Sequence, residues 1–340
     1  MLARGSRCRV GGERRMTGLH PVLDVRDVAV HFAPRGGRTG RPQPTVKAVD
    51  GVDLTIGAGE TLGLVGESGC GKSTLSNAIV GLVPPTRGSI KIRGQEIAGA
   101  TRETLHAVRS HVQMIFQDPV LSLNPRATIG AAIAEPLIVR RIATGPALKE
   151  RVAALLAQVG LRAEHASRYP HQFSGGQRQR IVIARALALE PALVLCDEPV
   201  SALDVSVRAQ ILNLLVDLQR RMGMSYLFVS HDLSVVRHIS DRVAVMYLGR
   251  IIEHASRDVF FAAPKHPYAR ALMSAVAEAN PVAQRAKRRV ILSGELPSPT
   301  NVPRGCPFHT RCPIVTEICA RERPLLTPRP DGALVACHHA

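Results

Sequence analysis

Short apolar runs of strand length recur along the chain and alternate with segments that have helical patterns. The runs at residues 61–65, 192–196 and 226–230 are almost continuous in apolar side chains, which is typical of central parallel strands buried on both faces. Helices are predicted over residues 73–82 and 205–222. Strands that alternate with helices predict an α/β fold, with a mostly parallel sheet and right-handed crossover connections.

Three regions depart from this alternation. Apolar residues alternate in part over residues 22–32 and 46–56, which predicts an antiparallel β edge. A helical texture predicts a helical insert over about residues 118–185. Further on, Pro, Cys and His replace regular periodicity. We therefore expect one domain over residues 21–260, followed by a small irregular extension over residues 261–340.

Composition and charge disfavour several classes of protein. With 340 residues and 45% apolar content, the chain can bury at least one large core, and no window reaches the roughly 18 apolar residues of a membrane span. The net charge of +17 is scattered and no aromatic residues lie among the basic runs, so solvated charge, aided by a nearby membrane, is favoured over nucleic-acid binding. Residues 1–20 lack the apolar segment of a secretory signal and are expected to form a disordered basic tail, with Met16 as an alternative start.

The sequence GESGCGKS at residues 66–73 matches the pattern of a phosphate-binding loop. It follows a predicted strand and precedes a predicted helix, which is the required context. In such a loop, backbone N–H groups surround a phosphate chain, the lysine reaches the β- and γ-phosphates, and the serine hydroxyl binds Mg²⁺. A glycine-rich turn before a helix is the alternative interpretation. The predicted phosphate-binding residues are Gly66, Glu67, Ser68, Gly69, Cys70, Gly71, Lys72, Ser73 and Thr74.

Polar side chains follow three of the predicted strands. Asp197 and Glu198 follow one buried strand, His231 follows another, and Gln117 ends a third. Ligands bind outside the carboxyl ends of the strands in open α/β sheets, so we expect a site at this edge. An acidic pair that caps a helix and a structural histidine are the alternative interpretations.

Together these motifs identify a family. They occur in one order with the segments SGGQ at residues 174–177 and SALD at residues 201–204, and over about residues 22–260 the chain resembles the ATP-binding subunit of ABC transporters. The resemblance implies a P-loop NTPase fold of ABC type. The later segments HPY, GELPSP and GCPF resemble the C-terminal extension of the oligopeptide/dipeptide (peptide/nickel) branch and lie at residues 266–268, 294–299 and 305–308.

The resemblance implies that the chain hydrolyses ATP with Mg²⁺ to power the import of oligopeptides or dipeptides. Glu198 is the expected general base, and His231 is expected to contact the γ-phosphate and steady the attacking water. Gln117 is expected to sense Mg²⁺ and the γ-phosphate. Phe32, at the end of an edge strand, is expected to stack on adenine, with a place in the core as the alternative. The expected Mg²⁺ ligands are Ser73, Gln117 and Asp197.

A second predicted anion site points to a partner subunit. Small residues open a helix at residues 174–177 and expose N–H groups to an anion, although the chain already has a complete phosphate loop. The resemblance implies that two ATPase subunits pack head to tail, so that each such segment closes over the other's ATP, with Asp204 near the interface. Only one phosphate loop occurs here, so the second comes from another chain, expected to be related but non-identical. The expected signature residues are Ser174, Gly175, Gly176 and Gln177.

The resemblance also implies membrane partners. Two permease subunits are expected to contact the helical insert around residues 118–170, and an extracytoplasmic peptide-binding protein acts through them. This places the chain peripherally at the cytoplasmic face of the inner membrane. Similar branches handle dipeptides, longer peptides, glutathione and nickel, and the sequence does not select among them. A nucleic-acid-associated ABC-type ATPase is the alternative function, although the sequence has neither a long coiled-coil insertion nor a second ATPase half. A metal-cluster regulatory module is a third, against which the intact Glu198 argues.

Four of the seven cysteines lie within the last 35 residues. They are separated by five, six and seventeen residues, which is wider than the spacing typical of zinc knuckles. A reducing compartment disfavours disulfides, and a small segment broken by prolines needs some other cross-link to stabilise one conformation. Because the extension that this segment resembles binds a 4Fe-4S cluster in some members, we expect a 4Fe-4S cluster here, with zinc and unmetallated thiols as alternatives. The expected ligands are Cys306, Cys312, Cys319 and Cys337.

Overall fold

The computed structural model of the protein describes most of the chain. The described residues are 21–33, 45–276, 285, 290, 292, 294, 295 and 297–340. The predicted disordered tail at residues 1–20, and most of the Pro- and Gly-rich segment between the first two strands, lie outside the described residues.

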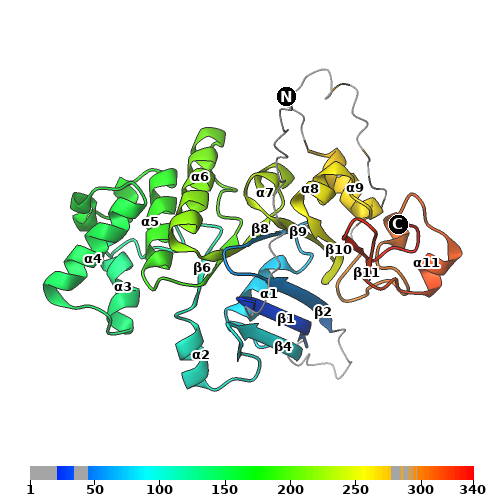
Figure 1. The fold of residues 1–340 in the computed structure, drawn as a ribbon, viewed down its shortest axis with the longest axis horizontal. Helices are drawn as coiled ribbons and strands as arrows, with labels where there is room; N and C mark the ends of the chain where they lie inside the picture. Colours follow the sequence, from blue (N-terminus) through cyan, green and yellow to red (C-terminus); the bar gives the residue numbers. More distant parts are fainter. Residues whose placement is uncertain are drawn as a thin grey trace, which may run out of the picture.

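An eight-stranded sheet forms the centre of the fold (Figure 1), in the order β11-β12-β10-β9-β3-β8-β7-β6. The five strands from β9 to β6 run parallel, and β10 and β12 add to one edge in antiparallel orientation. The apolar runs predicted as central strands form β3, β7 and β8, and every residue of these three strands is buried. The strand bounds are β3 Thr61–Val65, β6 Val112–Ile115, β7 Leu193–Asp197, β8 Ser225–Ser230, β9 Arg242–Tyr247, β10 Arg250–Ser256, β11 Thr327–Pro328 and β12 Leu334–Val335.

A smaller antiparallel sheet has the order β2-β1-β4-β5 and confirms the predicted β edge. Its apolar side chains pack with those of α1 (Lys72–Ile79) and with one set of side chains from the central sheet, such as Leu64 and Leu195, in a single buried cluster. The helix that follows the phosphate loop is therefore held between the two sheets. The strand bounds are β1 Leu23–Phe32, β2 Val46–Ile56, β4 Arg87–Ile92 and β5 Gln95–Glu96.

The helical insert lies at one end of the molecule and the C-terminal extension at the other (Figure 1). The insert contains α3 Ile129–Val139, α4 Gly145–Gln158, the short 3₁₀ helices η1 Ala163–Ser167 and η2 Pro170–Gln172, and α5 Gly175–Leu187. The other helices are α2 Arg102–Val108, α6 Val205–Met222, α7 Leu233–Ile239, α8 Arg257–Ala262, α9 Pro267–Ser274, η3 His309–Arg311 and α11 Glu317–Arg321. Among the helices of the described residues, none combines the length and apolar character that crossing a bilayer requires.

The C-terminal extension returns to the central sheet. Strand β12 pairs with β10, and the Ala336 N–H donates to the Ile252 carbonyl at 2.8 Å. Phe308 is 1% exposed, and its ring centroid lies 5.4 Å from that of Tyr247 in β9 and 5.6 Å from that of Tyr268 in α9. The sequence predicts a small extension without a large core, and in the structure this extension uses the core of the preceding domain.

Removal of the Phe308 ring tests this shared core. Phe308→Ala is expected to lower the free energy of unfolding by about 3 to 5 kcal/mol, because it leaves a cavity between two buried tyrosines. Urea unfolding followed by circular dichroism measures the change. Leu325→Ala is the control, since Leu325 is 76% exposed in the same extension. Equal unfolding midpoints for the two variants would show that the extension does not share the core.

Candidate active site

The phosphate loop connects β3 to α1 and is packed tightly against neighbouring backbone. Gly71 has φ +110°, and a Cβ there would lie 2.1 Å from the Ala48 carbonyl oxygen, so only glycine fits. The Lys72 side chain is buried and its Nζ donates to the carbonyl oxygens of Gly66 at 2.8 Å and Glu67 at 3.0 Å. The ammonium is thus held inside the loop by two backbone acceptors.

Two predicted Mg²⁺ ligands lie together, Ser73 at the end of the loop and Asp197 at the end of a central strand. Asp197 ends β7 and is 9% exposed. Burial raises the pKa of its carboxyl group, and a hydrogen bond with Ser73 and the charge of Lys72 oppose that rise. A buried carboxylate beside a serine hydroxyl is an oxygen donor set that suits Mg²⁺, so the residues present fit this ion.

The three predicted catalytic residues lie together, with two of the side chains contacting the carboxylate of the third. Gln117 Nε2 donates to Glu198 Oε2 at 3.2 Å, and His231 Nδ1 lies 3.0 Å from Glu198 Oε1. Glu198 has φ +48°, an uncommon conformation for a residue with a side chain, and its N–H donates to the Val229 carbonyl in β8 at 3.0 Å. Because β6, β7 and β8 are neighbours in the sheet, the residues that follow them meet at one edge.

One cavity of about 470 Å³ joins this carboxylate to the phosphate loop. A triphosphate in this cavity would contact the loop on one side and Gln117, Glu198 and His231 on the other. The sequence prediction missed three of the lining residues, of which Pro299 comes from the C-terminal extension, where the segment GELPSP was the only signal. The cavity is lined by Val46, Ala48, Ser68, Gly69, Gly71, Lys72, Ser73, Thr74, Gln117, Glu198, His231 and Pro299.

Four residues of the predicted ATP-binding set do not line this cavity: Phe32, Gly66, Glu67 and Cys70. Phe32 is 42% exposed at the end of β1, where it pairs with Val46, so the alternative of a core position is wrong. Cys70 is buried, and burial raises the pKa of its thiol, which favours the unreactive protonated form. The Glu67 side chain turns toward the C-terminal extension and forms an ion pair with Arg311.

The signature segment caps α5 and does not line the cavity of its own chain. The Ser174 hydroxyl accepts from the Gln177 N–H at 3.3 Å, and Gln177 Oε1 accepts from the Ser174 N–H at 3.0 Å. This reciprocal pair is a capping box. Asp204 occupies the N-cap position of α6 and likewise lies outside the cavity.

The four C-terminal cysteines gather but do not form a metal site as they stand. Burial raises the pKa of the Cys306 thiol to about 11, and the other three thiols act in the same direction, so all four lie within electrostatic reach. Cys319 Sγ lies 3.5 Å from His339 Nε2. Within the described part of the chain, no group of three or more His, Cys, Asp and Glu side chains has a metal-binding arrangement. The predicted 4Fe-4S cluster therefore has no support from this geometry.

Comparisons with known proteins agree with the motifs. Residues 49–201 match the ABC transporter family, and residues 252–319 match the family described as the oligopeptide/dipeptide transporter C-terminal region. The oligopeptide transport ATP-binding protein OppF of Escherichia coli is 54% identical over 312 residues, covering 91% of this chain and 93% of that protein. The di/tripeptide transport ATP-binding protein DppF of Pseudomonas aeruginosa is 49% identical, covering 95% of this chain and 98% of that protein.

Solved structures show the same fold. The ATP-binding cassette MJ0796, in a dimeric post-hydrolysis state with ADP and Pi, superposes with a TM-score of 0.61 at 30% identity. The match covers 69% of this chain and 98% of that one. CbiO1 of Clostridium perfringens, part of a transporter complex, has a TM-score of 0.61 at 26% identity, covering 71% of this chain and 91% of that one. These structures confirm the predicted P-loop fold of ABC type.

Gly71→Ala is expected to weaken nucleotide binding at least about tenfold, because the new methyl group forces the loop away from the Ala48 carbonyl. Titration of the purified chain with a fluorescent ATP analogue measures this. Gly69→Ala is the matched control: its φ is also positive, at +81°, but a Cβ there meets no atom within 4 Å. Equal affinities for the two variants would contradict a requirement for close packing at Gly71.

Proposed function

The chain belongs to the ATP-binding subunits of ABC transporters, in the oligopeptide/dipeptide branch, and from this premise we propose how its residues divide the work of ATP-driven peptide import. The chain hydrolyses ATP to power that import. One observation carries the proposal for the chemistry: Gln117, Glu198 and His231 face the phosphate loop across a single cavity. The relatives are named as transport proteins, so the alternative of a nucleic-acid-associated ATPase has no support.

ATP binding uses the loop backbone and Lys72. The N–H groups at the start of α1 surround the β- and γ-phosphates, and the Lys72 ammonium exchanges its two carbonyl acceptors for phosphate oxygens. Ser73, Asp197 and Gln117 would hold Mg²⁺, which neutralises charge that develops on the phosphates.

Hydrolysis uses Glu198 as the general base. Its carboxylate is oriented from both sides, by the Gln117 amide and the His231 ring, at the edge of the cavity that faces the loop. A carboxylate fixed in this way can accept a proton from a water molecule that attacks the γ-phosphorus in line with the leaving oxygen. His231, which is more exposed than Glu198, is free to contact the γ-phosphate as well.

Glu198→Gln is expected to leave ATP binding intact and to slow hydrolysis about 10²- to 10⁴-fold, because it removes the base without changing the phosphate loop. Phosphate release from the assembled transporter measures the rate, and filter binding of labelled ATP measures affinity. Glu103→Gln, at an exposed position in α2, is the control. Hydrolysis by Glu198→Gln at the parental rate would refute the assignment.

A partner subunit completes each ATP site. Ser174, Gln177 and the glycines between them lie outside the cavity of their own chain and present a capped helix N-terminus. We assign them, with Asp204, to the ATP held by a second ATPase subunit, packed head to tail. Since the chain has one phosphate loop, the second loop must come from another chain, and we propose a related but non-identical subunit.

The isolated chain is therefore expected to hydrolyse ATP slowly, and addition of its partner subunit is expected to increase the rate. Steady-state hydrolysis measured across a dilution series, with the oligomeric state followed by light scattering, tests this. Full turnover by monomeric chain at high dilution would contradict a composite site.

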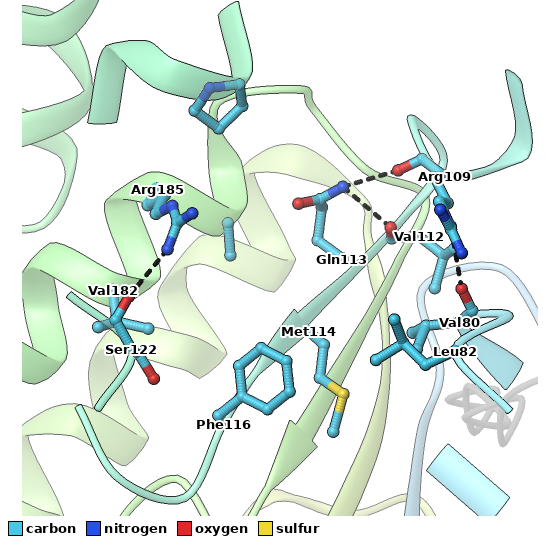
Figure 2. Close-up of a pocket in the computed structure, with 12 residues that line it drawn as sticks. Val80, Leu82, Arg109, Val112, Gln113, Met114, Phe116, Ser122, Val182 and Arg185 are labelled. Atoms are coloured by element: carbon cyan, nitrogen blue, oxygen red, sulfur yellow. Dashed lines mark hydrogen bonds between the residues drawn. The ribbon is translucent and has the colours of Figure 1, made fainter. Parts of the chain in front are cut away.

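We assign the docking of two membrane permeases to the surface around the helical insert. A cavity of about 290 Å³ opens there, between the end of α1, strand β6 and α5. Figure 2 shows Leu82, Met114 and Phe116 in its lining, and Arg185 bridging to the Ser122 carbonyl. Leu82 and Phe116 are 57% and 44% exposed.

One residue that lines this cavity is next to a catalytic residue in the sequence: Phe116 immediately precedes Gln117, which donates to Glu198. A permease segment that displaces Phe116 would therefore also displace Gln117, the next residue, which contacts Glu198. Such contacts would place the chain at the cytoplasmic face of the inner membrane, with an extracytoplasmic peptide-binding protein acting through the permeases.

We propose further that the four cysteines hold a structural 4Fe-4S cluster. Four cysteine thiolates are the ligand set that such a cluster takes, which supports the proposal, and their side chains would have to move to bind it. The cluster would fasten the loops of a segment whose strands have only two residues each. Zinc is the alternative.

Anaerobically purified chain is expected to contain about four iron atoms and to absorb broadly near 400 nm, as four-thiolate clusters do. Cys312→Ser should remove the iron while ATP binding at Lys72 remains. Elemental analysis and an ATP-analogue titration measure the two properties. Stoichiometric zinc without iron would exclude the cluster.

A further inference from the structure

The C-terminal extension contacts the phosphate loop at Glu67. Arg311 lies at the end of η3, and its two terminal nitrogens meet the two Glu67 carboxylate oxygens at 2.9 and 3.2 Å. The Arg311 side chain is 9% exposed and the Glu67 side chain 29% exposed. This is a bidentate, largely buried ion pair between residues 244 positions apart, and such pairs are geometrically specific.

The backbone of Glu67 is held by the same extension. Its N–H donates to the Tyr268 hydroxyl in α9 at 2.8 Å, and Tyr268 is fully buried. This N–H is therefore occupied by the extension and is not offered to a phosphate. Arg311 is held in turn by its backbone N–H, which donates to the Phe308 carbonyl at 3.0 Å. Burial raises the pKa of the neighbouring Tyr247 hydroxyl, and the Arg311 guanidinium opposes that rise.

These contacts with Glu67 also affect Lys72, the lysine proposed to bind phosphate. The Glu67 carbonyl accepts from Lys72 Nζ, so the position of the Glu67 peptide affects the position of the ammonium. Charge matters as well. Without Arg311, the Glu67 carboxylate would stand unpaired within the loop that binds a polyanion, and the two would repel each other.

The extension also lines part of the nucleotide cavity itself. Pro299 lines the cavity beside Val46 and Ala48, and its carbonyl accepts from the Lys47 N–H at 3.1 Å. The extension therefore contacts the phosphate loop at Glu67 and the cavity wall at residues 46–48.

We propose that Arg311 is a positioning residue for ATP binding: through Glu67 it sets the shape of the phosphate loop and neutralises a carboxylate that otherwise repels the triphosphate. This rests on the proposed use of the loop for ATP. The C-terminal extension then contributes to the nucleotide site in addition to packing against the central sheet.

The test measures the Kd of a fluorescent ATP analogue with Mg²⁺ on the full chain, without permeases, so that a failure of the transport function does not affect it. Arg311→Met keeps the packing of the aliphatic stem and removes the charge. We expect it to raise the Kd at least about tenfold, as fits the loss of one partner from a largely buried charge pair. Arg321→Met is the matched control, because Arg321 pairs with Glu317 in the same extension at 3.0 Å but is 75% exposed.

Glu67→Gln tests whether Arg311 acts by neutralising the Glu67 carboxylate, and separates this role from a general loss of stability. Added to Arg311→Met, it removes the repelling charge, and we expect the Kd to return to within about threefold of the parent. An Arg311→Met affinity equal to that of Arg321→Met would overturn the proposal. So would a raised Kd that Glu67→Gln does not restore, since that result indicates a structural role alone.

Thermal unfolding without nucleotide checks that each variant is folded. Should Arg311→Met prove unfolded, Arg311→Lys replaces it. The ammonium keeps the charge and loses the two-pronged geometry, so we expect a Kd about threefold above the parental value. An unchanged Kd for Arg311→Lys would overturn the proposal.

Discussion

The structure depends on close contact between the backbone of the phosphate loop and the backbone around it. A Cβ at Gly66 would lie 2.3 Å from the Met246 carbonyl oxygen of β9, and one at Gly71 would lie 2.1 Å from the Ala48 carbonyl oxygen of β2. The loop is thus wedged between the central sheet and the antiparallel sheet, and α1 is held between them. This arrangement fixes the backbone of the loop, and a preformed loop favours the ATP binding that we propose for it.

Periodicity predicted most of the elements that position the site. The predicted helix over residues 205–222 coincides with α6, and the predicted buried strands form β3, β7 and β8. The meeting of Gln117, Glu198 and His231 follows from parallel topology, because residues after adjacent parallel strands share one edge. The motifs were therefore enough to predict this part of the candidate site, although the roles of its residues remain proposals.

The contribution of the C-terminal extension was beyond sequence reasoning. Strand β12 has two residues and no detectable periodicity, so its pairing with β10 depends on tertiary contacts. The ion pair of Arg311 with Glu67 joins segments 244 positions apart, and no local sequence pattern predicts such a pairing. Pro299 enters the cavity wall for the same reason. In the structure, the extension that contains the four cysteines is thus in direct contact with the residues proposed to bind ATP.

The central claim is that ATP binds at the phosphate loop and that the signature segment serves the partner subunit. Hydrogen–deuterium exchange of this chain in the assembled transporter, with and without ATP and Mg²⁺, tests it most directly. The account predicts slower exchange both at residues 66–74, which hold the chain's own ATP, and at residues 174–177, which close over the ATP of the partner. Unchanged exchange at residues 66–74 with saturating ATP would contradict it.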